Sequence, residues 1–249
     1  MRQKTTAVLS AAALVLGMVG TAQAGTLEDV RDRGVLRCVV STGIAGFAQP
    51  DANGVWGGFD IDFCRATAAA VLGDASKIEA VTSTGKTRFT KLNAGEGDVL
   101  WRNTTITFSR DVSVKLRFHG VNYYDGQGFM VKKSLGVSSA SELDGASVCI
   151  QTGTTTELNL ADYFSSNGMK YEPVTIETND EARQNYEAGR CDVYTTDASG
   201  LASTRSALPD PDAHMVLPEI ISKEPLGPAT RHGDDQWSDI VTWVLNATI

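Results

Sequence analysis

The stretch Ala94-Gly-Glu-Gly-Asp-Val-Leu-Trp-Arg-Asn-Thr-Thr-Ile-Thr-Phe-Ser-Arg110 is echoed later in the chain by Ala188-Gly-Arg-Cys-Asp-Val-Tyr-Thr-Thr-Asp197. Near its start, each stretch has a glycine that ends a predicted helix, because glycine adopts the left-handed backbone conformation at little cost. Each stretch then continues as a short apolar strand that runs into threonine hydroxyls. Two copies are too few for a stacked repeat array, so the echo predicts two similar lobes. A chance match is the alternative, because helix–glycine–strand junctions are common.

The pattern around this repeat alternates strands with helices. Strands are predicted at 35–41, 77–83, 98–101, 129–132, 146–151, 172–176 and 191–195, and helices at 58–72, 86–94, 155–164 and 180–188. Such alternation predicts parallel sheets covered by helices, and therefore an α/β fold with two Rossmann-like lobes. We expect residues 25–124 to form the first part of lobe 1, residues 125–220 to form lobe 2, and residues 221–249 to return to lobe 1.

Two junctions link these lobes in the sequence, at residues 121–128 and 220–227. After the second junction, residues 228–232 and 237–245 are expected to rejoin lobe 1. The chain would then cross between the lobes twice and form a hinge. A hinge beside a cleft is typical of proteins whose lobes close around a ligand.

The first 24 residues have the features of a signal peptide rather than of a fold. Met1-Arg-Gln-Lys4 is positively charged, residues 7–20 are mostly apolar, and Ala22-Gln-Ala24 fits a cleavage site. The apolar run is too short for a committed membrane span, and no cysteine follows it to carry a lipid anchor. We therefore expect a periplasmic protein that is not membrane-anchored.

The charge of the chain is strongly acidic. It has 22 Lys and Arg against 30 Asp and Glu, and without Arg2 and Lys4 the net charge of the remaining residues is −10. A surplus of negative charge disfavours nucleic acid and anionic membrane surfaces as partners.

Four cysteines remain after the signal peptide, and an even number in an oxidising compartment suggests disulfides. Cys38 lies on a predicted strand and Cys64 on the helix packed against it, which brings them within bonding reach. Cys149 and Cys191 each mark a strand of lobe 2 and are expected to pair likewise. Free buried thiols are one alternative. A zinc site is another, although the chain has no CxxC or CxxH spacing, so we expect no metal.

The end of the first repeat copy has the groups that bind a small carboxylate. Arg110 would bind it through two parallel hydrogen bonds, assisted by donors from Asn103 and Thr105. The alternative for Arg110 is a surface ion pair with Asp111 or another acidic residue. The sequence Gln151-Thr-Gly-Thr-Thr-Thr-Glu157 adds a helix start, whose N–H groups attract anions, at Thr154 and Thr155. The alternative there is an ordinary helix cap.

The second repeat copy ends in an anion instead of a cation. Asp197 would accept hydrogen bonds from an ammonium group, or it would cap a helix that begins near Ala198. All these residues lie at predicted strand ends, where open α/β sheets place their ligands. A zwitterion held between Arg110 and Asp197 would have both of its charges paired.

A catalytic set is not apparent. The three histidines, His119, His214 and His232, lie in loop-like contexts, and there is no Gly-x-Ser-x-Gly motif. Asp60 and Asp62 are expected to be exposed residues at a helix start. We therefore expect a binding protein without a cofactor rather than an enzyme.

Several segments resemble the periplasmic solute-binding proteins of ABC amino-acid importers, of the two-lobed type 2 and family 3. Within that family the chain looks like the general L-amino-acid-binding proteins. The resemblance spans the mature chain and is carried by Gly57-Gly-Phe-Asp-Ile-Asp62, Asn103-Thr-Thr105 with Arg110, Tyr123-Tyr-Asp-Gly-Gln-Gly-Phe129, Gln151 to Glu157, Tyr194-Thr-Thr-Asp-Ala-Ser-Gly200 and residues 220–228.

The resemblance implies that Arg110, Thr105 and the helix start at Thr154 and Thr155 hold the α-carboxylate of an amino acid. Asp197 would hold its α-ammonium. The wall for the ligand side chain would be formed by Ser41, Ile44, Phe47, Trp101 and Arg102. Arg102 could meet a carboxylate or amide, which favours polar or acidic ligands or a broad range.

The family also implies a partner and a length. A monomeric receptor would deliver its L-amino acid to an inner-membrane ABC permease. An enzyme on the same fold, such as a carboxylate dehydratase, and an amino-acid sensor domain are the alternatives. Members of the family usually continue beyond the position of Ile249, so the chain is expected to be truncated at its C-terminus.

Overall fold

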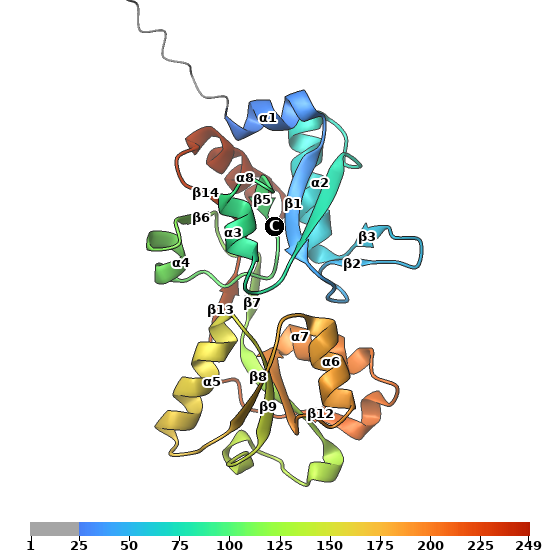
Figure 1. The fold of residues 1–249 in the computed structure, drawn as a ribbon. Helices are drawn as coiled ribbons and strands as arrows, with labels where there is room; N and C mark the ends of the chain where they lie inside the picture. The colour runs from blue at the N-terminus through green and yellow to red at the C-terminus, as the bar shows by residue number, and fades with distance from the viewer. Residues whose placement is uncertain (1–24) are drawn as a thin grey trace, which may run out of the picture.

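The computed structural model describes residues 25–249, and the predicted signal peptide, residues 1–24, lies outside the described residues. The described chain forms two lobes, one above the other in Figure 1, with two short strands between them. Each lobe has a five-stranded sheet with helices on its faces. The prediction of an α/β fold with two Rossmann-like lobes is confirmed.

Lobe 1 is built from both ends of the described chain. Its sheet has the strand order β4-β1-β5-β14-β6, in which β4, β1 and β5 are parallel and β14 is antiparallel to both neighbours. A small hairpin, β2 and β3, projects from it. The elements are α1 (Thr26–Arg33), β1 (Leu36–Ser41), β2 (Gln49–Pro50), β3 (Trp56–Gly57), α2 (Phe59–Leu72), β4 (Ile78–Ser83), α3 (Arg88–Asn93), β5 (Val99–Leu100), α4 (Phe108–Val112), β6 (Leu116–Phe118), β14 (Ala229–Arg231) and α8 (Asp235–Thr248).

Lobe 2 repeats this plan with the order β10-β9-β11-β8-β12. The first three strands are parallel, and β8 is antiparallel to β11 and β12. The elements are β8 (Gln127–Lys132), β9 (Ser147–Gln151), α5 (Thr155–Ser166), β10 (Glu172–Ile176), α6 (Asn179–Glu187), β11 (Val193–Asp197), α7 (Ala198–Ser206) and β12 (His214–Val216), with 3-10 turns at Lys133–Leu135, Ala140–Glu142 and Pro211–Ala213. The two glycines of the sequence repeat, Gly95 and Gly189, have φ angles of 75° and 71°, as the repeat predicted.

Alternate residues of the strands fill two cores in each lobe, because successive side chains of a strand point to opposite faces. In lobe 1, Cys38 and Val40 of β1 pack with α1, α2 and α8, while Val39 packs with Leu92 of α3. In lobe 2, the residues Phe129, Val131 and Ile150 face α5, and Met130, Cys149 and Tyr194 face α6 and α7.

Two disulfides connect elements within the lobes. Cys38–Cys64 ties β1 to α2 with a Cα–Cα distance of 6.2 Å, and Cys149–Cys191 ties β9 to the segment just before β11 with a Cα–Cα distance of 5.6 Å. Both predicted pairs are confirmed. Residues 25–249 contain no group of three His, Cys, Asp or Glu side chains placed to hold a metal ion.

The hinge consists of β7 (Tyr123–Asp125) and β13 (Glu224–Leu226), which pair antiparallel between the lobes (Figure 1). Backbone hydrogen bonds fix β13 to lobe 1: Ile106 N donates to Pro225 O at 2.8 Å and Gly227 N donates to Thr104 O at 3.0 Å. The division at residues 124 and 220 remains a prediction.

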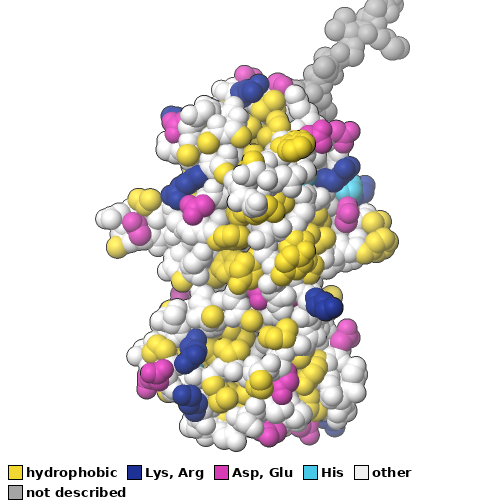
Figure 2. Space-filling model, turned by 180° about the vertical axis from the view of Figure 1, so that it is seen from behind, with side chains coloured by type: hydrophobic (Ala, Val, Ile, Leu, Met, Phe, Trp, Pro, Cys, Tyr) yellow, Lys and Arg dark blue, Asp and Glu magenta, His cyan; other side chains and the backbone are white. Residues whose placement is uncertain are grey.

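The surface of the described part has an uneven distribution of apolar side chains. Figure 2 shows them along the middle of the rear face, with Lys, Arg, Asp and Glu mostly toward its margins. Trp243 of α8 is 71% exposed, beside a groove between α1, α2 and α8. No helix in residues 25–249 is both long enough and apolar enough to cross a bilayer.

Candidate ligand-binding site

A narrow cleft separates the lobes where the strands of both sheets end. Lobe 1 contributes Arg88, Arg102, Asn103 and Thr105, and lobe 2 contributes Gln151, Thr154, Thr155, Thr156, Thr196 and Asp197. The lobes touch here: Thr105 Oγ1 lies 3.3 Å from Thr155 Oγ1, and Arg88 Nη2 donates to Gly153 O at 3.4 Å. The remaining cavity of about 20 Å³ has room for about one water molecule, so a larger ligand needs the lobes to open.

Arg110 lies behind Thr105 rather than on the wall of this cavity. Its Nη1 donates to Thr105 O at 2.7 Å, and its guanidinium carbon lies 5.2 Å from the centroid of the Phe89 ring. Burial lowers the pKa of Arg110 to about 10, and the nearby Glu224 and Asp197 raise it, so the side chain stays charged at neutral pH. The alternative of a surface ion pair with Asp111 is not found in the described part of the chain: Arg110 is buried, and Asp111 Oδ1 lies 3.2 Å from His232 Nε2.

Asp197 ends β11 and points its buried carboxyl group into the cleft. It stands at the N-cap of α7 but makes no side-chain capping bond to that helix. Burial raises the pKa of Asp197 to about 8, repulsion from Glu224 and Asp125 adds to the rise, and Arg88 and Arg110 oppose it. A carboxyl group in this state favours a ligand with positive charge, which would restore its ionised form.

Thr154 and Thr155 share a helix start but have different roles. Thr154 caps α5, because its Oγ1 accepts from Glu157 N at 3.2 Å while Glu157 Oε2 accepts from Gly153 N at 2.9 Å. The ordinary capping role weighed for Thr154 is therefore present. The hydroxyl of Thr155 is not used by the cap and reaches Thr105 and Glu224 across the cleft.

Arg88 is a cleft residue that the sequence did not identify. It opens α3 close to the C-terminal end of β4, is 3% exposed, and its Nε has no hydrogen-bond partner among the described residues. Burial is the main cause of a lowered pKa of Arg88, and repulsion from Arg102 and Arg110 lowers this pKa further. The signal that could have found it is its place just after a predicted strand, at the edge where the other site residues lie.

Comparison with known proteins agrees with this geometry. Residues 36–248 match the bacterial extracellular solute-binding proteins, family 3. The chain belongs to this family.

Relatives of this solute-binding protein are named for the amino acids that they bind. It is 59% identical over 246 residues to the glutamate/glutamine/aspartate/asparagine-binding protein BztA of Rhodobacter capsulatus, covering 99% of this chain and 73% of that protein. It is 57% identical over 243 residues to the general L-amino acid-binding periplasmic protein AapJ of Rhizobium johnstonii, covering 98% of this chain and 71% of that one. These relatives are named as periplasmic or binding proteins and not as enzymes.

A solved structure agrees with the fold. The periplasmic binding protein of an ABC transporter from Brucella ovis, with glutathione bound, superposes with a TM-score of 0.87 at 55% identity. The match covers 90% of this chain and 71% of that chain.

The expected exposure of Asp60 is wrong. Asp60 is 2% exposed at the start of α2, and its Oδ2 accepts from Asn103 N at 3.3 Å. Burial raises its pKa to about 6, while the Asn103 N–H and the charge of Arg102 lower it. Asp62 is exposed as expected and pairs with Arg65. Asp60 therefore supports the segment that carries Asn103 and Arg102.

Of the five residues expected to form the wall for the ligand side chain, Arg102 alone lines the cavity. Trp101 packs in the core of lobe 1, where it stacks on Phe63 and its Nε1 donates to Thr67 Oγ1 at 3.1 Å. The Ser41 hydroxyl donates to Ala48 O at 3.3 Å. Phe47 packs edge-on against Phe59 and Tyr123. These packing contacts give Trp101, Ser41 and Phe47 structural roles away from the cavity.

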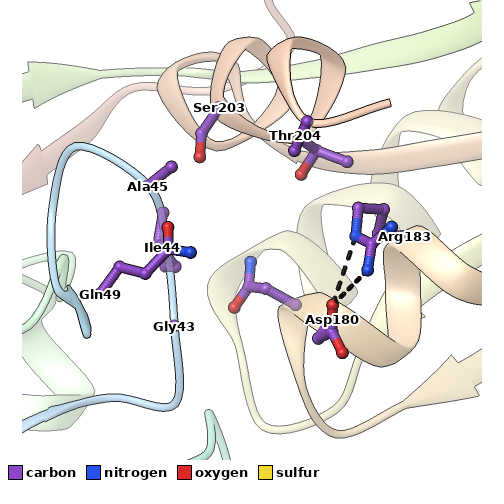
Figure 3. A pocket seen from close by; sticks show the side chains of 10 residues that line it. Gly43, Ile44, Ala45, Gln49, Asp180, Arg183, Ser203 and Thr204 are labelled. Atoms are coloured by element: carbon purple, nitrogen blue, oxygen red, sulfur yellow. Dashed lines mark hydrogen bonds and ion pairs between the residues drawn. The ribbon is translucent and has the colours of Figure 1, made fainter. Parts of the chain in front are cut away.

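Ile44 borders a second pocket between the lobes, of about 80 Å³ (Figure 3). The loop that carries Ile44 and Ala45 faces Ser203 and Thr204 of α7 and an ion pair of α6. In that pair, Arg183 Nη2 lies 2.7 Å from Asp180 Oδ1. Ile44 is therefore near lobe 2 but belongs to a different cavity from Arg102 and Asp197.

Proposed function

We propose that this solute-binding protein captures an L-amino acid in the periplasm and delivers it to an inner-membrane ABC permease. The observation that carries the proposal is that lobe 2 places Asp197 on the cleft wall, while lobe 1 places Arg110 directly behind the cleft residue Thr105. Arg110 would bind the α-carboxylate and Asp197 the α-ammonium. Because each lobe supplies one charge, a zwitterion satisfies both only when the lobes are closed around it.

The ligand side chain is proposed to be polar or acidic, or the range to be broad. Arg88 and Arg102 are both buried at the cleft, and the Nε of each lacks a partner among the described residues. A carboxylate or amide on the ligand would supply the missing acceptor, since an unpaired buried donor costs about 1–3 kcal/mol. The names of the relatives BztA and AapJ agree with acidic, amide and general L-amino acids.

The energy required is within the reach of so small a ligand. Micromolar affinity corresponds to about 8 kcal/mol. An amino acid of about ten heavy atoms would supply about 0.8 kcal/mol per atom, below the ceiling of about 1.5 for very small ligands. Two charge-assisted contacts in a closed cleft would contribute about 3–6 kcal/mol of this, and packing of the ligand would contribute the rest.

We further propose export with cleavage after Ala24 and action as a monomer without a cofactor. Simple binding is favoured over catalysis because each histidine is engaged away from the cleft. His119 bonds to Thr230 and Thr242, His214 bonds to Tyr186, and His232 bonds to Asp111.

A thermal-shift screen with the twenty common L-amino acids tests this function, because a ligand that binds the native state raises the melting temperature. At about 100 times the dissociation constant the gain is about 2.7 kcal/mol, or about 5–11 °C for a protein of this size. We expect such shifts with glutamate, glutamine, aspartate or asparagine. No shift with any of the twenty would reject amino-acid binding.

A further inference from the structure

Glu224 is a buried carboxylate that connects the hinge to both lobes. It begins β13 and is 2% exposed. Its Oε2 accepts from the hydroxyls of Thr105 in lobe 1 and Thr155 in lobe 2, the latter at 2.9 Å. Its Oε1 accepts from Asn159 Nδ2 and from Ser222 Oγ, both at 2.7 Å. Asn159 Nδ2 can only donate and each of the three hydroxyls has a hydrogen to donate, so the four contacts match what an ionised carboxylate accepts.

These contacts determine where the two threonine hydrogens point. Each hydroxyl has one hydrogen to donate, and an ionised carboxylate has none. Thr105 Oγ1 and Thr155 Oγ1 lie 3.3 Å apart, so one hydroxyl could instead donate to the other. In every such arrangement, both hydrogens stay within the cluster of Glu224, Thr105 and Thr155. Neither hydroxyl then has a hydrogen for a ligand carboxylate, and each presents a lone pair.

We propose that Glu224 is the positioning residue that turns Thr105 and Thr155 into acceptors for the ligand ammonium group. Both threonines and Asp197 line the same cavity. Together they offer three acceptors, and an ammonium group of the RNH₃⁺ type has three hydrogens to donate. This rests on the proposed binding of an amino acid. The sequence suggested that the Thr105 hydroxyl binds the ligand carboxylate. The proposal assigns this hydroxyl to the ligand ammonium group instead.

The acceptor set is complete only when the lobes are closed. Glu224 and Thr105 stay together because the backbone bonds of residues 104–106 to residues 225–227 hold β13 on lobe 1. Thr155 and Asp197 come from lobe 2. Closure therefore brings Thr155 and Asp197 up to Thr105, and the ligand's ammonium group binds best in the closed form.

The test compares two ligands that differ only at the ammonium, L-glutamate and (S)-2-hydroxyglutarate, by calorimetry. In the wild-type protein we expect L-glutamate to bind at least about 100-fold more tightly, the equivalent of two lost charge-assisted bonds. Glu224→Gln should reduce this ratio at least about tenfold, because the amide donates to the threonines and turns their hydrogens toward the ligand. The ratio is measured within one protein, so a general loss of stability does not change it.

Two further variants test whether Glu224 acts through the threonine hydroxyls or only as a nearby negative charge. In a Thr155→Val background, Glu224→Gln should change the ratio much less, since residues that act through one another are not additive. Glu219→Gln is the matched control, because Glu219 lies in the same segment but accepts from Ser139 Oγ and Ala140 N within lobe 2. It should leave the ratio unchanged. If Glu224→Gln does not fold, Thr155→Val should lower the ratio and Thr155→Ser should preserve it.

The outcomes distinguish this inference from the function on which it rests. A wild-type protein that binds neither ligand contradicts the proposed acidic amino-acid binding. If the wild-type protein selects L-glutamate and Glu224→Gln, or both Thr155 variants, keep the same selectivity, the positioning role of Glu224 is overturned. The proposed amino-acid binding then still stands.

Discussion

Gly85 is expected to be required for closure of the lobes and for little else. It lies between β4 and α3 of lobe 1, opposite the turn that precedes α5 of lobe 2. A Cβ at Gly85 would lie 2.9 Å from Thr152 O and 2.9 Å from Thr154 Cγ2, closer than real Cβ atoms approach. Its own backbone is outside the left-handed region, so alanine is compatible with the chain when the lobes are apart.

The cost of Gly85→Ala should therefore fall on the closed state. Overpacking of one methyl group costs about 1–3 kcal/mol, which weakens the ligand dissociation constant by about 5- to 140-fold. The melting temperature of the ligand-free protein should change little, because the open form has no clash. Calorimetry with L-glutamate measures the affinity, and small-angle X-ray scattering measures whether ligand still compacts the molecule.

A matched control is available in the same lobe. Gly57 of β3 also has an ordinary backbone conformation, and a Cβ there would meet no atom within 4 Å. Gly57→Ala should bind ligand like the wild-type protein. If Gly85→Ala also binds with unchanged affinity and compacts fully, then the contact of Gly85 with residues 152–154 does not belong to the ligand-bound form, and the reasoning is refuted.

Three further predictions concern the charges and the disulfide. Arg110→Ala should weaken amino-acid binding by more than about tenfold while the far-ultraviolet circular dichroism stays native, since the proposed charge-assisted contact to the ligand carboxylate is lost. Unchanged affinity in calorimetry would exclude the carboxylate role. Burial raises the pKa of Asp197 to about 8 in the closed cleft, so closure without a ligand takes up a proton at neutral pH. Small-angle X-ray scattering of the ligand-free protein should therefore show more of the compact form as the pH falls from about 8 to about 6, and Asp197→Asn should flatten this profile. The same shift means that the native state holds more protons than the unfolded state between the two pKa values, so Asp197 lowers stability as pH rises through that window. Replacing Cys149 and Cys191 by alanine should lower the free energy of unfolding by about 4 kcal/mol in the chain-entropy description of a loop spanning 42 residues, and denaturant titration with an unchanged midpoint would argue against this contribution.

The fold could be predicted where periodicity and turn chemistry were strong. Parallel strands such as β1 and β9 are apolar runs followed by helices, so the alternation was visible in the sequence. The three-residue strands β6, β7, β12, β13 and β14 were not among the predicted strands, because such short antiparallel strands have no measurable period. The insertion of β14 between β5 and β6 joins segments more than 100 residues apart, which local pattern does not reveal.

The site could be predicted only in part, for a similar reason. Arg110 and Asp197 stand at strand ends beside hydroxyl residues, and that context pointed to ligand binding. Arg88 and Glu224 belong to segments that look like an exposed helix start and a linker. Their burial results from the approach of the two lobes, which no single segment encodes. Trp101 was expected in the wall for the ligand side chain but lies in the core of lobe 1, since an aromatic residue beside a site packs equally well into a core.

The most direct test of amino-acid recognition by two opposed charges is calorimetric titration with L-glutamate, L-glutamine, L-aspartate and L-asparagine, each beside its N-acetyl derivative. We expect at least one free amino acid to bind with a dissociation constant of about 1 μM or lower. Its N-acetyl derivative should bind at least about 100-fold more weakly, because acetylation removes the positive charge of the ligand's ammonium group, which would face Asp197. Equal binding of a free and an acetylated ligand, or no binding of the four amino acids, would contradict the central claim.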